Sequence, residues 1–238
     1  VCQGCTADVP EDANFCLECG TPVAVRVCPS CGTLAARGRF CGRCGTAIDD
    51  AAPQEPDPSA GPVAERRMTS VLFGDLVGFT TLSEKRDAEE MRELMSRYFA
   101  QCRVIIGRYG GTVEKFIGDA VMAVWGVPVA HEDDAERAVR AGLERVSAMA
   151  VLGSERGADD LAIRVGIVTG EVAVTVGATQ EGMVTGDSVN TAARVQSAAE
   201  PSQVWVDDRT RSLASASVTF TDAGSHELKG KAEAVHLW

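Results

Sequence analysis

Residues 68 to 80 read MTSVLFGDLVGFT, and this stretch decides the fold on which the rest of the sequence builds. Met68 to Phe73 is an apolar run that predicts a buried strand. Asp75 follows where we expect that strand to end, and loops beside strand ends often carry functional residues. The stretch therefore predicts a buried strand with a carboxylate at its end.

The residues after this strand alternate between helix and strand patterns. From Ser83 to Gly107 the apolar residues follow the three-and-four spacing of one helix face. Thr112 to Trp125 predicts two strands joined by a turn at Gly118 and Asp119, and residues 131–152 predict another helix. Further elements are expected as strands at 161–169, 171–176, 204–206, 218–221 and 227–238 and as a helix at 187–199. Mixed strands, helices and hairpins indicate an α+β sandwich.

Length and charge limit the function classes that need to be considered. The chain has 238 residues, of which 45% are hydrophobic and 24% charged, which fits one globular domain with an appendage. A net charge of -11 argues against nucleic acid or anionic lipid as a partner. No apolar run approaches the roughly 20 residues of a membrane-spanning helix, and no signal peptide is recognisable, so we expect a cytoplasmic protein. The first residue is Val1, which leaves open a trimmed start or a larger parent chain.

Eight of the nine cysteines fall in the first 44 residues as four C-x-x-C pairs. The pairs are Cys2 and Cys5, Cys16 and Cys19, Cys28 and Cys31, and Cys41 and Cys44. Such spacing lets two knuckles complete a tetrahedral thiolate shell, so we expect two structural Zn²⁺ ions per chain. Disulfides or redox-active thiols are the alternatives, but the regular pairs and the lack of a secretion signal favour zinc. Residues 1–46 resemble a double zinc ribbon. The interleaved charges and the lack of clustered aromatics favour a protein partner for it over nucleic acid.

Residues 47–66 are rich in proline, small residues and acidic residues. This composition cannot bury a core and favours extended backbone. We interpret the segment as a linker that leads into a larger domain at 67–238.

Four segments of that domain occur in the order known from one enzyme family. FGDLVGFT at 73–80 resembles the first metal-binding signature of class III adenylyl and guanylyl cyclases, and VEKFIGDAVMAVWG at 113–126 resembles their hairpin with a second metal-binding aspartate. VTGDSVNTAARVQS at 184–197 is similar to the family's catalytic helix, and ELKGKAEAV at 227–235 to its terminal hairpin. Ordered motifs are more specific than any single one. The resemblance implies a ferredoxin-like catalytic domain that works as a head-to-tail homodimer with two interfacial sites.

The resemblance also implies a metal site. Asp75 and Asp119, helped by the backbone carbonyl of Leu76, would hold two Mg²⁺ or Mn²⁺ ions in each active site. Cyclisation needs the ribose 3′-hydroxyl to attack the α-phosphate while pyrophosphate leaves, and two metals between two carboxylates serve both needs. Hard oxygen ligands suit these ions. Without the family, each aspartate also fits an ordinary turn residue beside a glycine.

Asn190 and Arg194 are the catalytic residues that the resemblance implies. They are four residues apart and therefore share one helix face. In the family, the asparagine orients the ribose and the arginine stabilises charge that develops on the α-phosphate, a role that suits a planar, permanently charged guanidinium. From the residues alone, the pair fits a solvated polar face equally well.

The substrate positions follow from the same resemblance. Lys115 matches the lysine that reads adenine in adenylyl cyclases, where guanylyl cyclases usually carry glutamate, and so favours ATP. Met183 stands where adenylyl cyclases commonly place Asp or Thr. Its thioether is a weak acceptor, so one hydrogen bond worth about 0.5 to 1.5 kcal/mol is lost. The remaining positions are Arg164 and Lys229, which also fit surface charges, and the turn of Gly78, Phe79 and Thr80, whose amides can face phosphate.

Together these features predict a homodimeric adenylate cyclase for intracellular signalling, with guanylate cyclase less favoured. Asp75 and Asp119 would supply the metals, while Lys115, Asn190 and Arg194 arrive from the other chain. Two alternatives remain open at this point. Met183 motivates a regulatory module that binds nucleotide without turnover, and the ribbon motivates an interaction protein in which the cyclase region is a dimeriser.

Overall fold

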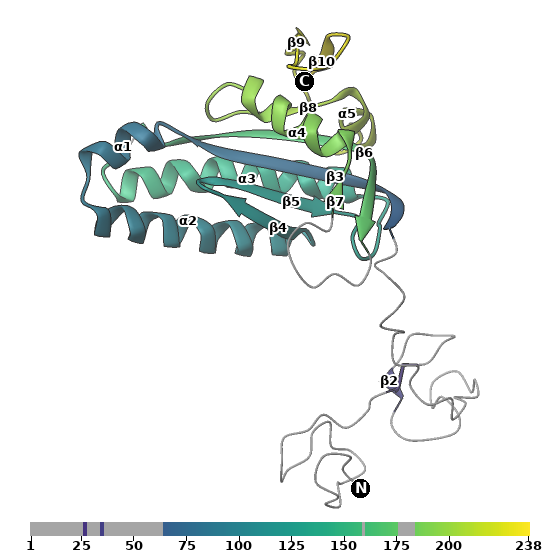
Figure 1. Ribbon diagram of the computed structural model, residues 1–238, viewed down its shortest axis with the longest axis horizontal. Helices are drawn as coiled ribbons and strands as arrows, with labels where there is room; N and C mark the ends of the chain where they lie inside the picture. The colour runs from purple at the N-terminus through teal and green to yellow at the C-terminus, as the bar shows by residue number, and fades with distance from the viewer. Residues whose placement is uncertain (1–25, 28–33, 36–63, 159, 176–183) are drawn as a thin grey trace, which may run out of the picture. The chain divides into compact units, whose positions relative to one another are not determined.

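The computed structural model describes residues 26–27, 34–35, 64–158, 160–175 and 184–238 (Figure 1). The chain divides into two compact units, Val1–Ala60 and Gly61–Trp238. In the first, β1 (Arg26–Val27) and β2 (Leu34–Ala35) pair antiparallel and flank the third C-x-x-C pair in the sequence. All eight predicted zinc ligands, the predicted linker up to residue 63 and Met183 lie outside the described residues.

The second unit is built on a mixed sheet. Its strand order is β4-β5-β3-β6-β7, and β8 pairs with β6 as the parallel partner. The strands are β3 (Ala64–Val77), β4 (Thr112–Ile117), β5 (Ala120–Trp125), β6 (Ala162–Thr175), β7 (Val184–Thr185) and β8 (Val204–Val206). β3 and β6 pair along their whole length, from Ala64 opposite Thr175 to Val77 opposite Ala162. This long ladder is the frame on which the candidate site lies.

Helices cover both faces of the sheet, with α2 and α3 on one side and α4 on the other (Figure 1). Their bounds are α1 (Phe79–Lys85), α2 (Ala88–Arg108), α3 (Asp134–Glu155), α4 (Asp187–Ala198) and α5 (Asp208–Ala214). A two-stranded hairpin of β9 (Gly224–His226) and β10 (Val235–Leu237) follows. Within the described residues, no helix has the length and apolar character needed to cross a membrane. The predicted α+β sandwich is confirmed.

The two faces of the sheet belong to two separate apolar cores. Along β3, Leu72 and Leu76 belong to the core under α2 and α3, whereas Val71 and Phe73 belong to the core under α4. Side chains alternate between the faces of a strand. The side chain of Asp75 therefore shares the α4 face with Phe73.

Several predicted boundaries were wrong for identifiable reasons. The helix predicted over 83–107 is two helices, because the Asp87 side chain accepts a hydrogen bond from the amide of Glu89 (3.1 Å) and starts α2 anew. The strands predicted on either side of Gly170 are one strand, β6. This glycine permits close approach, since a Cβ there would lie 2.1 Å from Ser188 Oγ. No strand occurs at 218–221, and of 227–238 only Val235–Leu237 is strand. Cys102, which falls on the apolar spacing of residues 83–107, lies in the core at 1% exposure.

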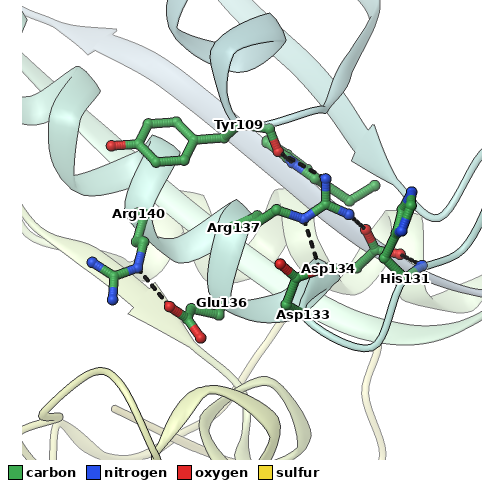
Figure 2. Close-up of polar contacts among 8 residues, drawn as sticks. Tyr109, His131, Asp133, Asp134, Glu136, Arg137 and Arg140 are labelled. Atoms are coloured by element: carbon green, nitrogen blue, oxygen red, sulfur yellow. Dashed lines mark hydrogen bonds and ion pairs between the residues drawn. The ribbon is translucent and has the colours of Figure 1, made fainter.

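A polar network fixes the end of the sheet that lies farthest from the β4–β5 turn (Figure 2). The carbonyl of Tyr109 accepts hydrogen bonds from Trp125 Nε1 (2.9 Å) and Arg137 Nη1 (3.2 Å). Asp134, buried at the start of α3, accepts from the amide of His131 (2.8 Å) and forms an ion pair with Arg137. These contacts tie together the ends of α2 and β5 and the start of α3. The hairpin therefore projects its turn from a fixed base.

Candidate active site

Asp75 and Asp119 come together because β3 and β5 are neighbours in the sheet. Gly74 is paired with Val121, so the residue after Gly74 lies beside the turn that precedes β5. Gly118 makes that turn with a φ of 64°. The charge of Asp119 contributes to the raised pKa of Asp75, as expected for two neighbouring carboxyl groups. The pairing of strands thus brings together two aspartates that are far apart in the sequence.

The electrostatics of this pair are set by burial and by the charge of each neighbouring group. Burial raises the pKa of Asp75, and the neighbouring charge of Asp119 raises it further. The backbone of Leu76 and the charge of Arg164 lower this pKa, but by less. Two neighbouring like charges at a half-buried position repel each other, and a bound cation removes that repulsion. The observation therefore fits a cation site.

The donors at this site are oxygens. Among the residues that the structure describes, no group of three or more His, Cys, Asp or Glu side chains is arranged to hold a metal. Two carboxylates and a backbone carbonyl are hard ligands, and ions such as Mg²⁺ complete such a shell with water or substrate phosphate. The donor set fits magnesium or manganese and does not fit a structural zinc site.

Arg164 is the cation nearest to this pair by strand register. Its Cα lies opposite that of Asp75 in the β3–β6 ladder, and it shares the α4 face because Ile163 and Val165 belong to the other core. The side chain is half-buried. Its buried Nε has no hydrogen-bond partner within the described part of the chain. This guanidinium therefore retains unused donor capacity beside the carboxylates.

The turn after β3 is the predicted phosphate-facing segment. Gly78 has a φ of 79° and stands at the start of α1, and its carbonyl accepts the amide of Leu82 (2.9 Å). The half-buried ring of Phe79 packs against the core under α2 and α3. Thr80 is in the first turn of α1. The chain thus turns sharply two residues after the predicted metal ligand Leu76.

Lys115 lies on β4, opposite Met122 of β5. Phe116, the next residue, packs against Phe99 of α2 with ring centroids 4.4 Å apart and ring planes tilted by 49°. Because neighbouring side chains alternate, Lys115 points to the opposite face, the one on which Met122 packs under α4. The lysine is half-buried at the edge strand of the sheet.

The predicted catalytic residues lie on a different surface of the domain. α4 buries Thr191, Ala192 and Val195 toward the sheet, at 6%, 0% and 0% exposure. Asn190 is exposed, and the spacing of 100° per residue puts it on the side of α4 opposite these buried residues. The side chain of Asp75 points to the sheet face on which this helix packs. Within one chain, Asn190 therefore points away from the carboxylate pair.

Arg194 lies on the same outer part of α4, next to the terminal turn. A Cβ on Gly230 would lie 3.3 Å from Arg194 Nη2, and Lys229, one residue before it, is exposed. Sequence reasoning missed the ion pair beside them, Asp187 with Lys231. The one sequence feature that could have pointed to this ion pair is the position of Lys231, two residues after Lys229 in the ELKGK motif. The predicted residues thus form two groups, with Asp75, Asp119 and Arg164 in one and Asn190, Arg194 and Lys229 in the other.

Three features of this domain are those expected of a nucleotide cyclase. They are a long β3–β6 ladder, an aspartate on a neighbouring hairpin turn, and a helix with an exposed asparagine and a half-buried arginine. The family comparison agrees with the geometry. The chain belongs to the class III cyclase family, because residues 63–238 match the model of the "Adenylate and Guanylate cyclase catalytic domain". Residues 2–48 match the model of the double zinc ribbon. The predicted ferredoxin-like cyclase fold and its N-terminal ribbon are both confirmed.

Two curated relatives show how far the sequence similarity extends. Adenylate cyclase 1 of Rhizobium meliloti (strain 1021) is 33% identical over 192 residues, which is 75% of this chain and 28% of the relative. An uncharacterized protein of the same organism, R02095, is 38% identical over 189 residues, 78% of this chain and 18% of its own length. The chain therefore spans less than a third of either relative.

Solved structures of cyclases are also similar to this chain in fold. The adenylyl cyclase CyaB from P. aeruginosa has a TM-score of 0.69 and 34% identity, over 74% of this chain and 94% of that one. The guanylyl cyclase Cya2 has a TM-score of 0.66 and 31% identity, over 74% of this chain and 92% of Cya2. The shared fold is that of the catalytic domain.

Proposed function

We propose that the protein is an adenylate cyclase that forms cyclic AMP and pyrophosphate from ATP at a homodimer interface. The observation that carries the proposal is the pairing of β3 with β5, which puts Asp75 beside the turn that holds Asp119. Burial raises the pKa of Asp75, and the neighbouring charge of Asp119 raises it further. An arrangement of this kind is unfavourable by itself and becomes favourable when cations bind.

Asp75, Asp119 and the carbonyl of Leu76 are the residues that would hold two Mg²⁺ or Mn²⁺ ions. When bound, such ions lower the pKa of the ribose 3′-hydroxyl and neutralise the triphosphate. Arg164, opposite Asp75, adds a positive charge on the same face. Its unpartnered Nε is a donor available to a phosphate oxygen.

The other half of the site would come from the partner chain. Asn190 and Arg194 lie on the outer side of α4, whereas Asp75 faces its inner side. A single chain therefore cannot direct both sets of residues at one nucleotide without rearrangement. In a head-to-tail dimer, the exposed Asn190 would hydrogen-bond the ribose. Arg194 would donate to the α-phosphate as charge develops there, and Lys229 would contact the triphosphate.

Lys115 supports ATP as the substrate over GTP. An ammonium group only donates, and adenine offers the ring nitrogen N1 as an acceptor where guanine carries an N–H. The relatives do not decide this point, because CyaB is named an adenylyl cyclase and Cya2 a guanylyl cyclase at comparable identity. The choice of base therefore depends on Lys115, with Met183 contributing little.

Turnover of both nucleotides by the purified chain tests the proposal. Incubated with ATP and Mn²⁺, the wild type should yield cyclic AMP and pyrophosphate, and Asp75→Ala should yield neither. With GTP, we expect a lower kcat/KM, and Lys115→Glu should reduce the preference for ATP. Absence of product at every protein concentration contradicts cyclisation, and a higher kcat/KM with GTP contradicts the choice of ATP.

For the N-terminal region we propose two structural zinc ions and a protein-docking role. Eight cysteines at four ligands per ion give that number of sites. Metal analysis of the purified chain should find about two zinc ions per chain, and Cys28→Ser should lower the content by about one. A chain that stays folded and active with no zinc would contradict this assignment.

A further inference from the structure

The turn that carries Lys229 is joined to the start of α4 by an ion pair. Lys231 Nζ contacts Asp187 Oδ2, with side-chain exposures of 22% and 76%. Asp187 is the first residue of α4, and its pKa is lowered by the hydrogen bond from Lys231. The favourable charge pair therefore forms between two segments that are 44 residues apart in the sequence.

Two further contacts hold the same turn. Leu228 is 5% exposed and belongs to the core under α4, and the amide of Lys231 donates to the Leu228 carbonyl (2.9 Å). Gly230 has a φ of 76°, and its backbone lies against the guanidinium of Arg194. The turn is thus attached to α4 on both sides of Lys229.

The attachment follows one stripe of the helix. Asp187, Asn190 and Arg194 are spaced i, i+3 and i+7, which places all three on one side of α4. Lys231 contacts the first of them and Gly230 the last, so the turn runs beside the stripe. The hairpin to which the turn belongs lies over α4, on the side away from β3 (Figure 1). Lys229 therefore belongs to a turn that contacts the same side of α4 as Asn190 and Arg194.

We propose that Asp187 and Lys231 are positioning residues for catalysis, and that their ion pair holds Lys229 and Arg194 in register for the nucleotide triphosphate. This inference rests on the proposed cyclase function. An exposed ion pair contributes little to global stability. Its energetic effect is local, because it decides whether a short turn stays against the helix that carries the reacting cations. Misplacement of such groups by about 1 Å can lower a rate by about 10²-fold.

A double-mutant cycle on activity tests the pair. Asp187→Asn and Lys231→Gln should each lower kcat/KM for ATP by about tenfold, and the double variant should be no worse than either. Asp187→Glu and Lys231→Arg keep the charges and should stay within about twofold of the wild type. Arg140→Gln, which breaks an ion pair with Glu136 (2.7 Å) on α3, is the matched control and should have no effect.

The cycle separates positioning from direct substrate binding by Lys231. If Lys231 instead bound the triphosphate, its loss would lower activity while Asp187→Asn would not, and that result overturns the proposal. Additive effects of the two substitutions would also overturn it, since they show independent roles.

A readout without nucleotide distinguishes failure of this inference from failure of the cyclase assignment. Hydrogen exchange of the Lys231 amide, which donates to Leu228, should accelerate at least about threefold in Asp187→Asn and remain unchanged in Arg140→Gln. If the wild type makes no cyclic nucleotide, the cyclase proposal fails and exchange alone decides whether the pair holds the turn. Unchanged exchange in Asp187→Asn overturns the positioning role.

Discussion

At the Asp75 end of the sheet a carboxyl group faces another carboxyl group, whereas at the start of α4 a carboxyl group faces a lysine. The pKa of Asp75 is raised by burial and by Asp119, while the pKa of Asp187 is lowered by Lys231. In the first region the neighbouring charges are alike, so a cation would be favoured there. In the second region the charge of Asp187 is balanced by Lys231, and this ion pair joins the turn of Lys229 to α4. The difference suggests a division of labour in which one half of the site recruits metal and the other half presents a rigid positive surface.

Removing either carboxylate tests the first region and should have the largest effect. Asp75→Asn and Asp119→Asn should each lower cyclic AMP formation by about 10³-fold, because the metal-dependent charge stabilisation is lost. Product quantified by chromatography under Mn²⁺ checks this. Activity within tenfold of the wild type for either variant would mean that the pair is not the metal site.

Mixing two inactive variants tests whether the halves belong to different chains. Asp75→Asn mixed with an equal amount of Arg194→Ala should regain about a quarter of the wild-type rate, since half of randomly formed dimers are mixed and each has one complete site. Asp75→Asn mixed with Asp119→Asn is the control and should regain nothing, because both lesions fall in the same half. Equal recovery of cyclic AMP formation in the two mixtures, or no recovery in either, would contradict the assignment of the two halves of the site to different chains.

Two glycines allow the cationic half to be displaced without removing any of its charges. Gly230→Ala places a Cβ 3.3 Å from Arg194 Nη2, whereas Gly224→Ala meets nothing within 4 Å at a similar φ of 86°. Both should cost about 1 kcal/mol in backbone strain. Only Gly230→Ala should also lower kcat/KM, by about tenfold. Parallel denaturation and activity measurements separate the two effects, and equal activity of the variants would show that the contact with Arg194 is unimportant.

The repulsion between Asp75 and Asp119 should affect the melting temperature of the domain as well as the rate of cyclisation. In metal-free protein, Asp75→Asn should raise the melting temperature by about 2–4 °C for each 1 kcal/mol of repulsion relieved. Added Mn²⁺ should stabilise the wild type and leave the variant unchanged, because only the wild type binds the ion. Thermal scans with and without Mn²⁺ check both statements. A variant that is less stable than the wild type without metal would contradict the repulsion inferred at this site.

Much of the carboxylate half was predictable from the sequence. Two strands joined at Gly118 and Asp119 and a buried strand over Met68 to Phe73 follow from local patterns, which the structure confirms. The predicted end of that strand before Asp75 was wrong, because β3 continues through Asp75, paired with Arg164, to Val77. That the two aspartates are neighbours depends on β3 lying next to β5, and no local pattern fixes the neighbours of a strand. The resemblance to cyclases supplied that long-range information. The extent of β6 was missed because Gly170 is typical of a strand break and here serves close packing against Ser188.

The α4 half was less accessible to sequence reasoning. Helical spacing correctly placed Asn190 and Arg194 on one face of a helix. The contact between Asp187 and Lys231 joins residues far apart in the chain, and neither residue type nor spacing distinguishes them from other surface charges. Residues 218–238 were predicted as longer strands, whereas short β9 and β10 with an anchored turn between them are what bring Lys229 to the helix.

The smallest predicted effect concerns the pH dependence of stability at Asp187. Because its folded-state pKa lies below the unfolded value, the ion pair stabilises the fold above about pH 4, and the contribution disappears as pH falls through the folded-state pKa. Asp187→Asn should therefore be less stable than the wild type at pH 7, by no more than about 0.5 kcal/mol for so exposed a pair, and equally stable at an acidic pH below the folded-state pKa. Urea unfolding at both pH values measures the difference. A loss of several kcal/mol would mean that Asp187 supports the whole domain, and the tenfold fall in activity expected for this variant would then follow from unfolding. A loss this small leaves the position of the turn as the cause.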